Sequence, residues 1–303
     1  MKQFFINLIV CVLMLFIASC GNTKRMSATK ARLGVIKENQ LKETAEVNAI
    51  ALKGENKYKE QKIDSNINVR LVKKMNVLKK IMDSVNSETN NLELLSTQKK
   101  NFKSSSYKSI VLPKLLALED FNANKILRTQ TYMMLQDGLD ISSYTLFDLA
   151  AFFGPGKYAI PDDKIELARN SFSPLVDSII QFSNKYNQLP RAATLVILGF
   201  ADAAGFVEES EINDTLLAKM AKTTATKQEL NIKLSELRAE ELIHLLTLEF
   251  IKKNNNILHL ETLRVEYLGK GKGEQYPLNK ITDYKDDDER RRVVLCYWSV
   301  LPD

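Results

Sequence analysis

The feature that most constrains the fold is a continuous apolar run, Leu195 to Phe200, followed by Ala201-Asp202-Ala203-Ala204-Gly205. An apolar run of this length that stops at a polar turn predicts a buried strand. Segments of strand length and segments of helical periodicity alternate around it. We expect strands near 147–153, 194–200, 258–267 and 291–300, and helices from after 162 to about 186 and near 227–253. This order predicts an α/β (α+β) domain over residues 147–303, a βαβαββ two-layer sandwich with helices on one sheet face.

One detail of the first helix stays open at this point. Its apolar face consists of Phe172, Leu175, Val176, Ile179 and Phe182, at helical spacing. Ser173-Pro174 is either the N-cap and first residue of this helix or a kink within a longer one.

Three further motifs accompany the strand end. They are Asn231-Ile232-Lys233-Leu234-Ser235-Glu236-Leu237-Arg238-Ala239, then Gly271-Lys272-Gly273-Glu274-Gln275-Tyr276-Pro277, and finally Arg290-Arg291-Arg292-Val293-Val294-Leu295. Together with the Asp202 turn, and in this order, they resemble the OmpA-like peptidoglycan-binding domain family. The resemblance covers roughly the last half of the chain, the usual size of a single domain.

The resemblance implies a ligand and the residues that bind it. The family clamps the meso-diaminopimelate of a peptidoglycan stem peptide, whose end carries an ammonium beside a carboxylate. Asp202 and Arg238 match the family's two binding side chains, and Asn231 matches a further polar contact. Arg291, Arg292 and Leu234 are the supporting positions. A planar carboxylate that is held bidentately favours Arg over Lys.

Each of these residues also has a simpler interpretation when taken alone. Asp202 after a strand could form a turn or cap a helix. Arg238 could be a surface residue that pairs with Glu241, three positions on. Two departures from the family pattern are visible: Ala201 stands where threonine is usual, and a long insertion, about 206–229, follows Asp202. The insertion, in which 215–222 is a candidate helix, could cover the site, dock a partner or block binding.

The N-terminus has the anatomy of an export signal. Lys2 precedes an apolar run from Phe4 to Ile17, which is too short to span a bilayer comfortably. Ile17-Ala18-Ser19-Cys20 resembles a bacterial lipobox, which implies that 1–19 is removed and that Cys20 carries fatty acyl chains such as palmitate. The alternative is an ordinary signal peptide with an incidental Cys20. By lipoprotein sorting habits the outer membrane, with the protein facing the periplasm, is the expected location.

Residues 20–105 form a lysine-rich segment that we expect to be an extended helical stalk. Positions 21–105 hold 18 basic against 9 acidic residues. Leu71, Met75, Leu78, Met82 and Val85 follow heptad spacing. Either the stalk self-associates through this seam, or it is one amphipathic helix packed on its own neighbours. We expect residues 106–146 to be a connector that packs on the C-terminal domain, with a short helix at 124–135 and a turn at Asp137-Gly138.

Several functional classes lack the residues that they need. His244 and His259 have no second ligand at metal spacing, so we expect no metal, no cofactor and no histidine-based catalysis. The basic segment is poor in aromatic residues, which argues against nucleic acid. The prediction is therefore a non-catalytic outer-membrane lipoprotein that tethers the envelope to peptidoglycan. The alternative is an envelope assembly or scaffold protein whose degenerate OmpA-like domain binds protein partners.

Overall fold

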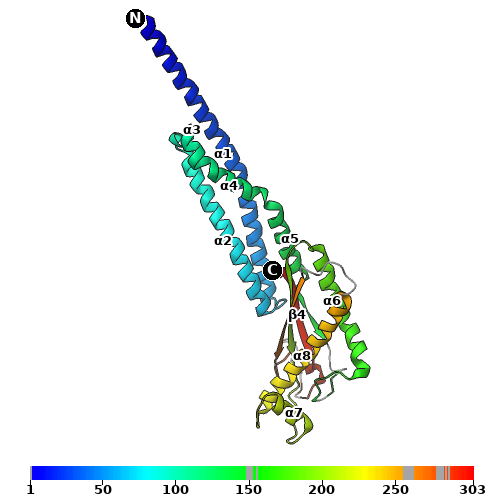
Figure 1. Cartoon of the computed structure of the whole chain (residues 1–303). Coiled ribbons are helices and arrows are strands. Elements are labelled where there is room, and N and C mark those ends of the chain that lie inside the picture. The colour runs from blue at the N-terminus through cyan, green and yellow to red at the C-terminus, as the bar shows by residue number, and fades with distance from the viewer. Residues whose placement is uncertain are drawn as a thin grey trace. The chain divides into compact units, whose positions relative to one another are not determined.

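Figure 1 shows the architecture of the chain in a computed structural model. It describes residues 2–147, 153, 154, 156–254, 263–277, 283, 285 and 287–303, and of these it describes the side chains of all but 2–20 and 254. The chain divides into two compact units. The first comprises Met1–Leu52 and Val72–Tyr132, and the second comprises Lys53–Leu71 and Met133–Asp303.

The first unit is helical. Its helices are α1 (Lys2–Lys59), α2 (Ser65–Ser96), the short α3 (Ser104–Ser106), α4 (Leu112–Ala123) and α5 (Lys125–Ile141), of which α1, α2 and α5 continue into the second unit. Polar contacts align α1 and α2 as antiparallel neighbours. Gln40 Nε2 donates to Thr89 Oγ1 at 2.8 Å, and Lys37 pairs with Glu93 at 2.8 Å. The apolar core of this unit is formed by Leu33, Ile36, Leu92, Phe102, Val111, Leu115 and Leu118.

The heptad positions are buried within the single chain. Leu71, Met75, Leu78 and Met82 all lie in the interior of the fold, and Val85 packs against the core of the first unit. Of the two possibilities that the sequence leaves open, the structure therefore matches an amphipathic helix packed on its own neighbours. A helical stretch does precede the sheet, as predicted.

The second unit contains a four-stranded mixed sheet. Its strands are β1 (Ser143–Phe147), β2 (Arg191–Gly199), β3 (Leu263–Gly271) and β4 (Val294–Pro302), in the spatial order β1-β4-β2-β3. β2 runs parallel to β3, whereas β4 is antiparallel to both β1 and β2. With α6 (Ile165–Lys185), α7 (Glu211–Lys219) and α8 (Lys227–Asn254), the element order confirms the predicted βαβαββ fold, with α7 as an addition.

Helices α6 and α8 share one apolar core with one face of the sheet. Leu195 and Ile197 of β2 and Cys296 and Trp298 of β4 are in register on this face. Residues of α6 such as Phe172 and Ile179, and residues of α8 such as Leu242 and Leu246, complete the core. The nine residues of β2 are all buried, which explains its unbroken apolar run.

The opposite face of the sheet is covered by the segment Lys53–Leu71, where α1 ends and α2 begins. Thr194, Val196 and Ser299 are buried on this face. Arg70 Nη1 donates to Thr194 Oγ1 at 3.1 Å and forms an ion pair with Glu266 of β3. The two predicted layers are therefore present, and this helical turn adds a third.

Some predicted boundaries differ from the structure. β1 ends at Phe147 instead of starting there, and 148–152 lie outside the described residues, as does the predicted strand start at 258–262. α5 continues to Ile141 across the predicted turn at Asp137-Gly138. A Cβ at Gly138 would lie 2.6 Å from the carbonyl oxygen of Val300, so glycine here permits close approach to β4 and marks no turn.

The predicted connector is divided between the two units. Residues 106–132 belong to the helical unit, because Val111, Leu115 and Leu118 pack with Leu33 and Ile36 of α1. Residues from Met133 onward belong with the sheet. The apolar face of α4 thus packs on α1. The spacing of apolar residues predicts that such a face exists but not which helix it contacts.

Pro174 lies inside α6, so it is part of a longer helix and not its first residue.

Helix α1 begins at Lys2. The side chains of the predicted signal peptide and of Cys20 lie outside the described ones. In the part of the chain that the structure describes, no helix has an apolar stretch long enough to cross a membrane.

Candidate functional site at the end of β2

The end of β2 is joined to α8 and to the loop after β3 by main-chain contacts. Lys272 N donates to Gly199 O at 2.8 Å, and Ala201 N donates to Gly273 O at 2.9 Å. Gly273 N donates in turn to Ser235 Oγ of α8 at 2.8 Å. A Cβ at Gly199 would lie 1.9 Å from Ser235 O, so glycine is required for this approach. Three motifs that are far apart in sequence therefore meet at one place.

Asp202 is buried at this place and has two partners. Its Oδ2 accepts a hydrogen bond from Arg292 Nε at 2.5 Å, and its Oδ1 accepts one from Ala204 N at 3.3 Å. The second bond is the turn-forming role that Asp commonly plays. The first is a charge-assisted bond to the residue that leads into β4.

Arg238 lies in the interior, only 1% exposed. Its Nε donates to Lys157 O at 3.0 Å and its Nη1 donates to Phe200 O at 3.1 Å. Burial lowers the pKa of Arg238 to about 10; nearby Asp202 opposes this effect and Arg292 adds to it. The simpler interpretation, a surface arginine paired with Glu241, does not hold, since Glu241 Oε1 instead accepts from Ile160 N at 3.4 Å.

Asn231 is 1% exposed and is tied to the loop after β3. Its Nδ2 donates to Glu274 Oε1 at 2.7 Å. Its Oδ1 is buried and accepts no hydrogen bond from the residues that the structure describes. A buried acceptor without a donor is unusual and is a candidate for a ligand contact.

The remaining candidate positions have structural neighbours. Arg291 Nη2 donates to Glu274 O at 2.5 Å, and its guanidinium carbon lies 5.0 Å from the ring centre of Tyr276. Leu234 is buried in an apolar cluster with Ala201, Leu216, Leu230 and Leu237. Arg291 thus braces the loop after β3, and Leu234 belongs to the core.

The insertion forms α7, which packs on the first half of α8. Ser210 caps this helix, since its Oγ accepts from Asn213 N at 3.4 Å. Leu216 is fully buried, and Ile212 packs at the edge of the same cluster. The predicted helix at 215–222 is therefore present, but it starts four residues earlier, directly after its cap, and ends at Lys219.

The insertion also contacts the segment that covers Arg238. Gly156 adopts a positive φ of 67°, and Ile212 lies 3.8 Å from where its Cβ would be. Tyr158 packs against the cluster of α7, and Lys219 Nζ lies 5.8 Å from the centre of its ring. Segment 156–158 is thus held between α7 and Arg238. This arrangement could not be predicted from residue identities, because the group that covers Arg238 is the main-chain carbonyl of Lys157.

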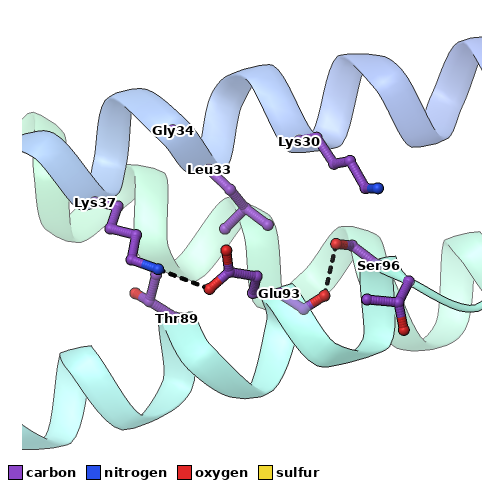
Figure 2. A pocket seen from close by; sticks show the side chains of 8 residues that line it. Lys30, Leu33, Gly34, Lys37, Thr89, Glu93 and Ser96 are labelled. Atoms are coloured by element: carbon purple, nitrogen blue, oxygen red, sulfur yellow. Dashed lines mark hydrogen bonds and ion pairs between the residues drawn. The ribbon is translucent and has the colours of Figure 1, made fainter.

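The structure contains a cavity next to this site and another in the first unit. One, of about 290 Å³, borders the loop after β3 and is lined by Gln228, Ile232, Gly271, Lys272, Glu274, Gln275 and Tyr276. The other, of about 280 Å³, lies in the first unit where Gly34 contributes no side chain between α1 and α2 (Figure 2). The Lys37–Glu93 pair crosses that second cavity. Among the described residues, no three His, Cys, Asp or Glu side chains are grouped to hold a metal ion.

Comparison with known proteins gives limited information. No family model matches the sequence, and the search of curated proteins found no match. Two crystal structures of the periplasmic domain of Helicobacter pylori MotB are similar to this chain at TM-scores of 0.28 and 0.29. The identities are 14% and 16%, over 52% of this chain and 76% and 74% of those chains.

Proposed function

We propose that this protein is a non-catalytic lipoprotein that tethers the outer membrane to the cell wall. Acyl chains on Cys20 anchor it, with the sheet domain in the periplasm. That domain binds the diaminopimelate end of a peptidoglycan stem peptide through Asp202 and Arg238. The observation that carries the proposal is the charge of the buried cluster formed by Asp202, Arg238 and Arg292.

This cluster holds two guanidinium groups and one carboxylate. Asp202 is directly paired with Arg292, whereas the hydrogen bonds described for Arg238 go to neutral carbonyl groups. A buried charge without a counter-charge is costly, and the lowered pKa of Arg238 reflects that cost. A ligand carboxylate at Arg238 would supply the counter-charge that this guanidinium does not have in a direct ion pair. The ammonium group of the same ligand would find acceptors in Asp202 and in the unused Oδ1 of Asn231.

Ligand entry requires one exchange. Since Arg238 is covered, a ligand carboxylate has to replace Lys157 O as the acceptor for Arg238 Nε. The packing of α7 on segment 156–158 sets how easily this happens.

The test is retention of the full chain on purified sacculi, with free diaminopimelate as competitor. We expect Asp202→Ala and Arg238→Ala each to weaken binding by about 1.5–3 kcal/mol, the contribution of a hydrogen bond to a charged group. Arg191→Ala is the matched control: Arg191 is also fully buried and donates to main-chain carbonyls, but it lies at the other end of β2. Unchanged retention of both site variants would refute the proposal.

A second candidate function follows from the covered state of the site. Asp202 is already paired, and α7 packs on the segment that covers Arg238. In this second function the domain has lost its ligand and serves as a scaffold for envelope proteins. Stoichiometric co-purification with such partners, together with no sacculus binding by well-folded protein, would favour this second function.

A further inference from the structure

The end of the first unit that lies nearest to Cys20 carries a cluster of basic side chains. We call it the basic end and define it as Lys24, Arg25, Lys99, Lys100, Lys103 and Lys108. The four lysines that follow α2 are all exposed, as is Lys24.

The basic end is made of two segments, one around Arg25 in α1 and one around Phe102 after α2. The fold brings them together although Arg25 and Phe102 are 77 positions apart in the chain. Arg25 Nη1 donates to Phe102 O at 3.3 Å, and its guanidinium carbon lies 5.8 Å from the ring centre of Tyr107. Phe102 is fully buried in the core of the unit, which fixes the turn between α2 and α3. Figure 1 shows α3 beside α1, with α1 continuing beyond it toward the N-terminus.

The positive charge of the basic end is not balanced locally. Positions 21–37 and 97–118 contain no Asp or Glu. The nearest carboxylates are engaged elsewhere: Glu93 with Lys37, Glu119 with Arg32, and Glu88 with Lys114. Lys24, Lys99, Lys100, Lys103 and Lys108 have no acidic partner within the described part of the chain. Most basic residues farther along α1 form ion pairs, namely Arg32, Lys37, Lys42, Lys53 and Lys59, so this end of the unit carries an excess of positive charge.

We propose that the basic end is a membrane-contact surface that binds anionic phospholipid headgroups. The inference rests on the proposed lipid anchor for its placement. Cys20 and Lys24 lie on the same helix, about 6 Å apart along its axis. Acyl chains on Cys20 would therefore hold the basic end within about one Debye length, ~8 Å, of the headgroups. A basic surface beside a lipid anchor gives membrane attachment a second, electrostatic component.

The test measures vesicle binding in the absence of acyl chains. It uses the chain from Cys20 onward with Cys20→Ser, because all residues of the described hydrophobic clusters follow Gly21 and are kept. Vesicles contain phosphatidylglycerol mixed with phosphatidylcholine, or phosphatidylcholine alone. We expect binding only to the anionic vesicles, and we expect it to weaken as salt increases.

Paired substitutions locate the surface. Lys99→Ala with Lys100→Ala should lower the partition coefficient about 25-fold, since each lysine near an anionic surface contributes roughly five-fold. Lys79→Ala with Lys80→Ala is the matched control, because these neighbouring lysines of α2 are equally exposed but lie outside the basic end, and it should change little. Equal losses for the two pairs, equal binding to neutral vesicles, or equally tight binding to duplex DNA would overturn the inference. Sacculus binding depends on the second unit, so that measurement separates failure of this inference from failure of the proposed wall-binding function.

Discussion

At the scale of single residues, two glycines illustrate how packing decides the role of the same amino acid. Gly199 lies where β2 meets α8, and an added Cβ would overlap Ser235 O at 1.9 Å. Gly34 lies within α1, and an added Cβ would meet nothing within 4 Å. The first glycine is needed for close approach, whereas the second only weakens its helix.

We therefore expect opposite effects from the same substitution. Gly199→Ala should lower the free energy of unfolding by about 3 kcal/mol, because main chain has to move to relieve the overlap. Gly34→Ala should raise it by about 1 kcal/mol, the difference in helix propensity. Urea titrations followed by circular dichroism measure both changes. A neutral Gly199→Ala would show that the contact between β2 and α8 is looser than described.

The site residues show what sequence can and cannot supply at this scale. The motifs single out Asp202, Asn231 and Arg238. The structure places Asp202 and Arg238 at the end of β2 and ties Asn231 to the loop after β3, and their role in ligand binding remains a prediction. The partners of Arg238 could not be foreseen, because Lys157 O is a main-chain group 81 positions away. Every residue has a main-chain carbonyl oxygen, so the amino-acid type at position 157 does not indicate that its oxygen accepts this hydrogen bond.

At the scale of elements, the apolar pattern of the sequence predicted those strands and helices whose buried faces are set by their immediate neighbours. The unbroken apolar run gave β2, and leucines at helical spacing gave α8, because each is buried against its own neighbours. The cover on the second sheet face was missed for a different reason. It comes from Arg70 and its helical turn, which lie 124 positions before their contact at Thr194.

The central strand β4 provides a test of burial. Complete burial raises the pKa of the Cys296 thiol to about 12. With Cys11 and Cys20 replaced or removed, Cys296 is the one remaining thiol, and we expect a thiol reagent to label it only after unfolding.

The same shift has a consequence for stability. The folded state retains the thiol proton at pH values where the unfolded chain, with a pKa near 9, has lost it. The stabilisation is therefore complete below pH 9 and is lost as the pH rises toward 12. If the thiol reagent labelled Cys296 at the same rate in native buffer and in denaturant, the thiol would not be buried and neither effect would hold.

At the scale of the whole molecule, the division into units determines which fragments can fold. The segment Lys53–Leu71 covers one face of the sheet and belongs to the second unit. A fragment of residues 106–303, the boundary that the sequence suggests, would expose Val196, Leu198 and Leu301.

We therefore expect the 106–303 fragment to aggregate or to unfold without cooperativity, whereas the chain from Cys20 onward should not. Exposed apolar surface of this kind promotes association. Size-exclusion chromatography and thermal melting compare the two proteins. A monomeric 106–303 fragment with a sharp transition would show that the cover on this face contributes little.

The position of β4 has a consequence for the time course of folding. β4 follows the other strands in sequence but lies between β1 and β2 in the sheet, and β1 has no other described partner. During synthesis, the helices of the first unit can form from local contacts as they emerge, whereas the sheet has to wait for its last strand. Until then, the apolar faces of β1 and β2 are open to incorrect pairing, so the nascent second unit is the part of this protein with the greatest need of a chaperone.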